Sequence, residues 1–428
     1  MLCLIFRRLC YNRVILQTRR ENMKKQITKL VALSMSLMLF ASPLTACGKK
    51  KQESLSYETW WTSDGESSSE TTAPSTTSSE TQTTASTEPS ETTPVGMIEN
   101  PFTGLYEVDE ANKGKKGIGI TVNNCKVANP QRGTTEASVI FEYETEGGQT
   151  RLLCMYPDIS KIPLVGAVRS GRVGASDMCA GTGAIFVCWG ADYTAVPAHV
   201  KSNNIVWFDL NNYIYDSLRG HDADEVPDGR YCWRDREWMN QPGHRTGVEH
   251  CGVTRGDFIL KAFEKNKIDI SGEMPKMFNF VETGKAKMQD SVPCNEINVY
   301  FSSTNDDGLF VYNAAEGVYY KSQYNGEPQM DDNVDKQISF TNVFVIFCPI
   351  VARPNDKSSE RHKDIHFEEG GSGYYVSNGK LINITWTKPT PNDPIKCFDS
   401  NGNEIEVNAG KSYICVVDND YMNKTTYK

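Results

Sequence analysis

The sequence predicts an α+β fold, in which an N-terminal α/β layered domain over residues 98–268 is followed by a mainly antiparallel β domain over residues 269–428. Three observations lead to this prediction. Globular composition begins near residue 100, the next part alternates short β-like runs with helical patterns, and the last part consists of apolar runs separated by turn residues. Roughly 330 globular residues also exceed what one hydrophobic core usually organises, so two domains are expected.

Residues 1–46 have the layout of a secretory signal segment. Basic residues follow Met23 and precede an apolar run over 30–40. Met23 is therefore the expected start of translation. A spanning helix needs about 20 apolar residues, so this run is too short to cross a bilayer. Small residues then lead to Cys47 in a pattern that resembles a bacterial lipobox. We therefore expect export, a diacylglyceryl anchor on Cys47, and a location on the outer face of the bacterial cell membrane.

Residues 47–97 are dominated by Ser, Thr and Glu, with almost no aliphatic side chains. Such a segment cannot bury enough apolar area to offset the entropy of ordering the chain. We expect a disordered stalk between the membrane anchor and the globular body.

The net charge argues against one class of partner. The full chain has a formal charge of −9, and residues 1–46 hold eight basic residues and one acidic residue, so the remainder carries −16. A protein that binds nucleic acid or anionic lipid generally needs a basic surface to neutralise phosphates. We therefore expect no nucleic-acid partner.

The first predicted domain alternates strands and helices. Its predicted strands are 117–122, 139–143, 150–156, 184–189 and 205–210, and its predicted helices are 170–180, 194–201 and 256–265. Thr254 and Asp257 are spaced like a capping box at the start of the last helix. This alternation is typical of an α/β layered domain.

The second predicted domain contains strands that are separated by turns. The predicted strands are 297–301, 309–312, 317–322, 342–347, 373–376, 381–386, 404–407 and 412–417. Asn-Gly pairs at 325–326, 378–379 and 401–402 are hairpin turn signals, because both residue types tolerate positive φ.

Ten cysteines follow Cys47, and their spacing matches no zinc or haem pattern. They are Cys125, Cys154, Cys179, Cys188, Cys232, Cys251, Cys294, Cys348, Cys397 and Cys415. Several lie inside apolar runs, so we expect mostly free thiols, with disulfides as the open alternative in an exported protein. No cysteine has neighbours in the sequence that would lower its pKa, so no cysteine nucleophile is predicted.

Three glutamates alternate along one predicted strand. Regular β geometry would place Glu142, Glu144 and Glu146 on one face, where at least one carboxylate could reach a cleft. If the strand at 150–156 pairs antiparallel with it, Arg151 lies opposite the glutamates and forms a charged pair with one of them.

A second candidate group lies at the start of a predicted helix. Arg169, Ser170 and Arg172 lie where this helix begins and its free backbone N–H groups favour an anion, and the two guanidiniums could hold a carboxylate or phosphate. The alternative is an internal Arg–Glu network that locks this junction. Asn123 and Asn124, at the end of a predicted strand, add polar groups to the candidate site.

His250 is a candidate general base if folding places it near Glu142, and otherwise a hydrogen-bonded loop histidine. No histidine pair carries the flanking glutamate of a zinc helix, so no metal site is predicted. The sequence also lacks a P-loop, a dinucleotide fingerprint and a nucleophile elbow, and we expect no cofactor.

Several sequence blocks together carry a family resemblance. They are residues 100–105, 123–124, 130–133, 146–151, 166–172, 342–343, 371–373, 379–386 and 408–410, with Glu142 between them. These blocks resemble the YerB-type lipoproteins, which carry domain-of-unknown-function family 3048. The resemblance implies a fold and a location, and it assigns no activity.

Three hypotheses for function follow. In the first, the body is an envelope binding module that holds an anionic ligand, such as a cell-wall fragment or a peptide carboxylate, through Arg151, Arg169 and Arg172, with Glu142 orienting them. In the second, the β-rich part is a scaffold that docks an envelope protein. In the third, the protein is an envelope hydrolase or transferase in which Glu142 is the general base and the arginines hold substrate.

Overall fold

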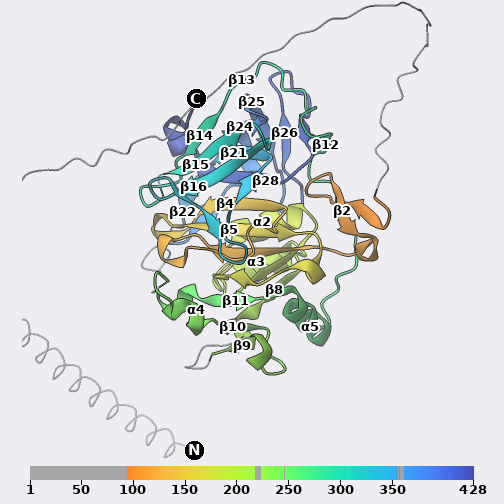
Figure 1. Ribbon diagram of the computed structural model, residues 1–428, viewed down its shortest axis with the longest axis vertical. Coiled ribbons are helices and arrows are strands. Elements are labelled where there is room, and N and C mark those ends of the chain that lie inside the picture. The colour runs from red at the N-terminus through yellow and green to blue at the C-terminus, as the bar shows by residue number, and fades with distance from the viewer. Residues whose placement is uncertain (1–93, 217–222, 245, 306, 355, 357–360) are drawn as a thin grey trace, which may run out of the picture. The chain divides into compact units, whose positions relative to one another are not determined.

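The computed structural model of the chain describes residues 94–216, 223–244, 246–305, 307–354, 356 and 361–428. The predicted signal segment, the lipidation site at Cys47 and all but the last residues of the predicted stalk lie outside these ranges. The described residues belong to one compact unit, drawn in colour in Figure 1. Among them, no helix is both long and apolar enough to cross a bilayer.

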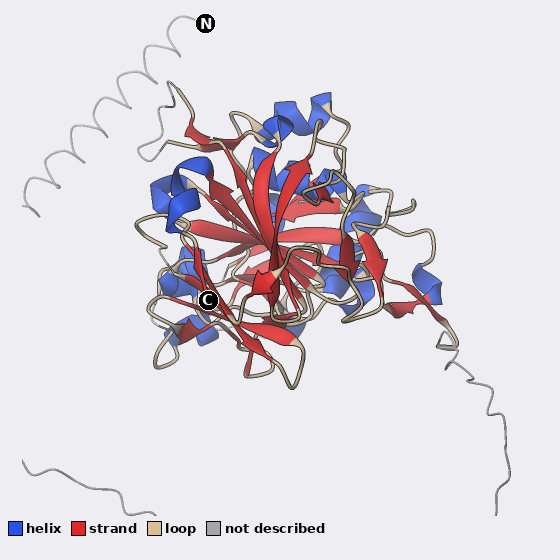
Figure 2. Cartoon of the chain, turned by 90° about the horizontal axis from the view of Figure 1, so that it is seen from above, coloured by secondary structure: helices blue, strands red, loops and turns tan. Residues whose placement is uncertain are grey.

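A large central sheet dominates this unit, and its strands fan out across the middle of Figure 2. In spatial order, the strands are β13 (Val292–Pro293), β25 (Lys380–Thr387), β24 (Gly371–Ser377), β21 (Asn342–Cys348), β28 (Ser412–Asp418), β4 (Val139–Glu144), β5 (Thr150–Tyr156), β3 (Ile118–Asn123), β7 (Ile185–Cys188) and β8 (Trp207–Asp209), with β26 (Lys396–Phe398) paired to β25. The order shows that strands from both halves of the sequence share one sheet.

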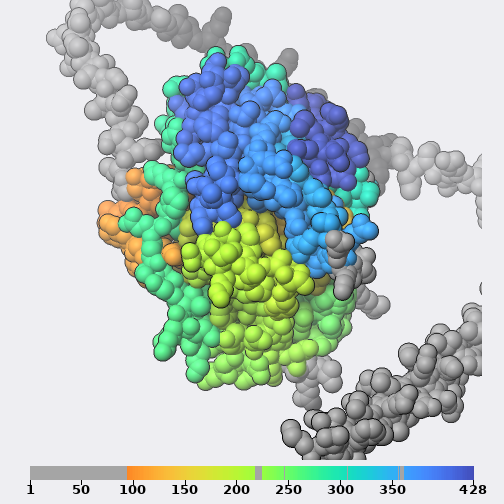
Figure 3. Space-filling view, turned by 180° about the vertical axis from the view of Figure 1, so that it is seen from behind, coloured from red at the N-terminus to blue at the C-terminus, as the bar shows by residue number. Residues whose placement is uncertain are grey.

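The central sheet is mixed, and its parallel pairs join distant parts of the chain. β28 lies parallel to β21 on one side and to β4 on the other, with Ser412 opposite Val139. β4, β5 and β3 follow as antiparallel neighbours, and β7 and β8 continue the sheet in parallel. In Figure 3 the blue C-terminal segments accordingly lie directly against the yellow-green N-terminal ones.

The prediction of an N-terminal α/β layered domain is wrong. β3, β4 and β5 are connected without an intervening α-helix, and β4 pairs with β28 from the other end of the sequence. The unit is therefore mostly β, and its N-terminal strands close their sheet with C-terminal ones. The sequence prediction placed β4 and β28 in different domains, because a parallel partner far along the chain leaves no local signal.

Two smaller sheets cover one face of the central sheet. The second sheet contains β17 (Glu327–Pro328), β16 (Val318–Gln323), β15 (Gly308–Asn313), β14 (Glu296–Val299) and β29 (Thr426–Tyr427), with β20 (Ser339–Phe340) paired to β16. The third contains β6 (Val165–Gly166), β11 (Gly252–Thr254), β10 (Cys232–Arg234) and β9 (Ile214–Tyr215). Four strand pairs complete the β structure: β1 (Met97–Glu99) with β2 (Tyr106–Asp109), β12 (Asn279–Val281) with β27 (Glu406–Asn408), β18 (Met330–Asp331) with β19 (Lys336–Gln337), and β22 (Ile350–Ala352) with β23 (Lys363–Ile365).

The α-helices of the described residues are short and lie at the periphery in Figure 2. They are α2 (Val173–Gly181), α3 (Val196–Ser202), α4 (Arg236–Asn240) and α5 (Gly256–Asn266). The predicted capping box on α5 is wrong, because the hydroxyl of Thr254 donates to the carbonyl of Tyr231 and Arg255 is the N-cap residue.

Both faces of the central sheet are buried from β21 to β7, which explains the near-continuous apolar sequences of these strands. Because successive side chains point to opposite faces, Ile140 and Phe141 of β4 enter different core clusters. Ile140 belongs to the cluster that contains Trp233 of the third sheet and Phe263 of α5, whereas Phe141 belongs to the cluster that contains Met178 of α2. Each buried side chain of this size contributes about 1.5–3 kcal/mol to folding.

Candidate functional site

A cavity of about 470 Å³ lies where the ends of β3, β4 and β5 meet loops from other parts of the chain. Its lining residues are Asn123, Cys125, Lys126, Val127, Thr145, Glu146, Gln149, Thr150, Arg151, Arg169, His250, Thr304 and Tyr324. We call it the arginine cavity. Five residues predicted from the sequence, Asn123, Glu146, Arg151, Arg169 and His250, meet there.

The β4–β5 turn brings a carboxylate to two guanidiniums. β4 ends at Glu144, and the 3-10 turn η3 (Glu146–Gly148) carries Glu146 away from the strand. Arg172 donates to Glu146 from Nε at 2.6 Å and from Nη2 at 2.7 Å, which is a bidentate pair. Burial opposes ionisation of Glu146, but the hydrogen bonds and charge of Arg172, with Arg151, hold the pKa of that carboxyl below its ordinary value.

Arg151 points from β5 into the same corner. The antiparallel pairing of β5 with β4 is confirmed, and Arg151 lies opposite Tyr143 in the register. Its Nη1 donates to the carbonyl of Ser170 at 2.6 Å, and its Nη2 lies 3.6 Å from Glu146 Oε2. Burial, with the nearby charge of Arg172, lowers the pKa of Arg151 to about 10, so it remains a cation at neutral pH.

Arg169 and His250 form another part of the wall. Arg169 Nη1 donates to the carbonyl of Glu249 at 2.8 Å, and no described polar atom hydrogen-bonds to its buried Nε. Burial lowers the pKa of Arg169, and the charges of neighbouring arginines act in the same direction. Burial also lowers the pKa of His250, followed by the positive charge of Arg169.

The cavity therefore carries an excess of positive charge. Lys126, Arg151 and Arg169 line it as cations, while its one carboxylate, Glu146, is held by Arg172 from outside. Lys126 is engaged at the surface by Glu327 at 2.9 Å, which leaves the two arginines as the inner cations. A bound anion would relieve the repulsion between them.

Two predicted site residues lie in a buried network instead. Glu142 has no solvent exposure, and its Oε1 accepts from Asn124 at 2.7 Å and from Asn305 at 2.9 Å. Its Oε2 accepts from Tyr413 at 2.6 Å and lies 3.8 Å from the buried ammonium of Lys321. We call these five residues the Glu142 network. Its carboxylate does not face open space, so the predicted role of Glu142 as a general base fails.

The remaining predicted residues position the chain. Ser170 accepts the hydrogen bond from Arg151 through its carbonyl, and Arg172 is the N-cap residue of α2. Glu144 pairs with Lys363, so the three glutamates of the predicted face diverge to different partners. For Arg172, the alternative of an internal Arg–Glu pair describes the structure.

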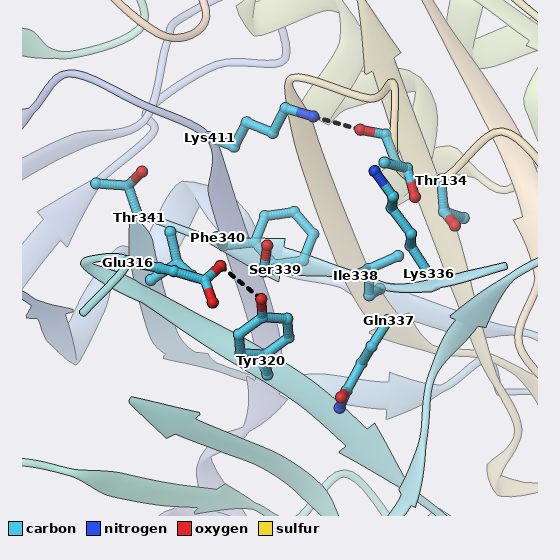
Figure 4. Close-up of a pocket in the computed structure, with 12 residues that line it drawn as sticks. Thr134, Glu316, Tyr320, Lys336, Gln337, Ile338, Ser339, Phe340, Thr341 and Lys411 are labelled. Atoms are coloured by element: carbon cyan, nitrogen blue, oxygen red, sulfur yellow. Dashed lines mark hydrogen bonds between the residues drawn. The ribbon is translucent and has the colours of Figure 1, made fainter. Parts of the chain in front are cut away.

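A second cavity, of about 550 Å³, lies beside β16, β19 and β20 (Figure 4). The amine of Lys411 donates to the carbonyl of Thr135, and Tyr320 donates to Glu316 at 2.6 Å in an exposed contact. None of the predicted site residues lines it, and the arginine cavity has the more deeply buried charged groups. The described residues contain no group of His, Cys, Asp or Glu placed to hold a metal ion.

Comparison with known proteins agrees with the sequence blocks. The N-terminal and C-terminal domains of a family described as protein of unknown function (DUF3048) match residues 102–239 and 297–414. A protein of Bacillus subtilis (strain 168) named "Putative lipoprotein YerB" is 26% identical over 295 residues, which is 68% of this chain and 78% of the relative. The crystal structure of YerB protein from Bacillus subtilis matches with a TM-score of 0.61 and 21% identity, covers 77% of this chain and 99% of that chain, and supports the fold. The chain belongs to the YerB-like DUF3048 family, whose activity is unknown.

Proposed function

We propose that this protein is a membrane-anchored envelope lipoprotein whose body binds an anionic ligand in the arginine cavity. The relative named as a lipoprotein and the predicted signal layout support the anchor. The ligand proposal rests on two arginines in the wall of a cavity of about 470 Å³. Arg151 is buried and Arg169 is partly buried, and both are cations.

The chemistry of the wall favours a carboxylate or a phosphate. Guanidiniums in a partly desolvated cavity bind such groups through charge-assisted hydrogen bonds. Gln149 supplies an amide beside them, as expected for a peptide or sugar carrying the anion. A cell-wall fragment with a peptide carboxylate fits this description.

The third hypothesis, a hydrolase or transferase with Glu142 as general base, requires the carboxylate of Glu142 to face solvent. The Glu142 network buries it completely, so this form of the enzyme hypothesis lacks its base. The docking-scaffold hypothesis stays a prediction, and the binding experiment distinguishes it from the first.

The test is a thermal-shift titration with muropeptides, phosphate and small dicarboxylates. A ligand at a hundred times its dissociation constant should add about 2.7 kcal/mol to stability. Arg169→Gln should weaken binding about tenfold or more, because a hydrogen bond to a charged group contributes about 1.5–3 kcal/mol. Lys336→Gln, which removes one cation from the second cavity, is the matched control and should bind normally.

If Lys336→Gln loses binding and Arg169→Gln does not, the ligand occupies the second cavity. If no anion shifts the melting temperature of the folded protein, the binding proposal fails and the scaffold hypothesis gains support.

Anion affinity should rise as the pH falls below the ordinary histidine value of about 6.5, because the pKa of His250 in the free protein lies below it. The pKa of His250 is lowered in the free protein, and a nearby anion would raise it, so binding takes up a proton. His250 also affects the stability of the ligand-free protein. Because its pKa is lower in the folded protein than in the unfolded chain, the unfolded chain takes up the proton first, and the free energy of unfolding decreases as the pH falls below about 6.5. Isothermal titration at pH 5.5 and 7.5 measures the difference, which His250→Gln should abolish; equal affinities in the wild type would contradict the prediction.

A further inference from the structure

Cys125 differs from the other nine cysteines of the described body. All ten are free thiols, but nine are buried, whereas Cys125 is partly exposed on the wall of the arginine cavity. It begins the turn between β3 and η2 (Lys126–Ala128), immediately after Asn123 and Asn124. A thiol at this place can meet a bound molecule.

The imidazole of His250 lies beside this thiol. Cys125 Sγ is 3.5 Å from His250 Nδ1, and Asn123 Nδ2 is 2.8 Å from the same nitrogen. Asn123 Oδ1 accepts from the backbone N–H of Cys125 at 3.1 Å, which directs the amide NH₂ toward the ring. Because an amide NH₂ only donates, Nδ1 is the nitrogen with the lone pair, and Asn123 occupies that lone pair in this structure. The thiol can give its proton to Nδ1 once the amide of Asn123 turns away from the ring.

A carboxylate stands on the other side of the ring. His250 Nε2, which carries the proton in this tautomer, is 3.5 Å from Glu249 Oε1. Thiol, imidazole and carboxylate thus follow one another in the order of a nucleophile, its base and the group that orients the base. The segment η7 (Val248–His250) supplies the last two groups and β3 leads to the first.

We propose that Cys125 is a nucleophile for acyl transfer, with His250 as its general base and Glu249 as a positioning residue, in a site that becomes active when the amide of Asn123 releases the ring. The sulfur forms a bond to the carbonyl carbon of an ester or amide, and the bond from that carbon to the leaving group breaks. The proton moves from sulfur to His250 Nδ1 and then to the leaving group. Water hydrolyses the resulting thioester, which returns the thiol and releases a carboxylic acid.

The surrounding charges suit this step. Burial raises the pKa of the Cys125 thiol, while Arg169 acts in the opposite direction, and the pKa of His250 is lowered. The resting pair is therefore a neutral thiol and a neutral imidazole, so the proton transfers as the sulfur attacks. Arg169 then lies close to the developing negative charge.

The substrate class follows from the cavity. The acyl group would carry a second, anionic group, held by Arg151 and Arg169, and this part of the inference rests on the proposed anion site. A peptide or amino-acyl derivative with a free carboxylate meets both requirements. The thiol–imidazole pair itself stands on its own geometry.

The first experiment measures alkylation of the folded full chain with iodoacetamide and with iodoacetate. Trypsin releases Cys125 in the peptide 117–126, which contains no other cysteine, so its labelling rate can be followed by mass spectrometry. We expect Cys125 to react faster than the nine buried cysteines and to prefer the anionic reagent. Arg169→Gln should remove that preference. Equal labelling of Cys125 and the buried cysteines would overturn the proposal.

The second experiment uses mono-4-nitrophenyl succinate, with 4-nitrophenyl acetate as the neutral comparison. One equivalent of nitrophenolate should be released in a burst, with the succinyl group on peptide 117–126. Cys125→Ala should abolish the burst, and His250→Gln should slow it about 100-fold or more. Cys251→Ala, which removes the buried cysteine next to His250, should leave it unchanged.

The outcomes separate this inference from the proposed function. Absence of a burst, or a burst that survives in Cys125→Ala, overturns acyl transfer. If Cys125→Ala still shows the thermal shift with anions, the binding proposal stands without the nucleophile. Equal burst rates with the neutral and the anionic ester at the same concentration would overturn the assigned substrate class.

Discussion

Replacing Glu142 with alanine should destabilise the protein by about 3–5 kcal/mol, because it leaves a charge buried without its partner. Lys321 and Glu142 have no exposed side-chain area, and their charged atoms are 3.8 Å apart. The same carboxylate accepts hydrogen bonds from Asn124, Asn305 and Tyr413, which would lose their acceptor. Urea denaturation, followed by circular dichroism, measures the loss.

Two further variants make this result specific. Glu327→Ala removes an exposed carboxylate paired with Lys126 and should change stability by about 0.5 kcal/mol or less. In the double variant Glu142→Gln, Lys321→Met, neither charge of this pair remains, and the loss of stability should be smaller than the sum of the losses in Glu142→Gln and Lys321→Met alone. Normal stability of Glu142→Ala would show that the network does not support the fold.

Replacing Glu146 with glutamine should cost about 2–5 kcal/mol, and added anion should restore part of it. The substitution removes the bidentate partner of Arg172 and the nearest carboxylate to Arg151. Both guanidiniums would then lie beside the arginine cavity without a counter-charge. Phosphate could take the place of the lost carboxylate, so the melting temperature should rise with phosphate more than in the wild type.

Glu406→Gln is the matched control for this variant. Its carboxylate pairs with Lys287 at an exposed position, so the change should cost less than about 1 kcal/mol. Chloride at equal ionic strength separates specific anion binding from general salt effects. An equal response of Glu146→Gln and Glu406→Gln to phosphate would contradict the expected rescue.

Local patterns predicted single elements better than their assembly. The β-like run over 150–156 marks β5 at its observed bounds, and its antiparallel pairing with β4 follows from the short turn between them. The layered N-terminal domain failed because β4 has β28 as its other neighbour. Nothing within 139–144 indicates that its partner lies at 412–418.

Distance along the chain also separates the predicted site residues that meet in the arginine cavity from Glu142, which does not. Asn123, Glu146, Arg151 and Arg169 come from neighbouring segments, and their chemistry was visible in the sequence before the structure placed them together. Glu142 looked equally polar, but its partners Lys321 and Tyr413 come from the C-terminal half.

The contact between Cys125 and His250 is the feature of the site that could least be predicted from the sequence. Cys125 is far in sequence from His250, so no flanking residue indicated a base for the thiol. The predicted role of His250 depended on Glu142, whereas the ring contacts Asn123 and Cys125. Cys125 and His250 meet only when the segments of β3 and η7 are folded together, so no single sequence motif contains both.

The position of β28 has a consequence for the order of folding. This strand is translated late, yet it fills the space between β21 and β4 and pairs in parallel with both. Until it arrives, β4 and β21 expose unpaired apolar edges, which are liable to aggregate. If the proposed export begins at the N-terminus, the core cannot be completed during transport, and folding should wait until almost the whole body has emerged. Contacts of such long range also favour slow folding.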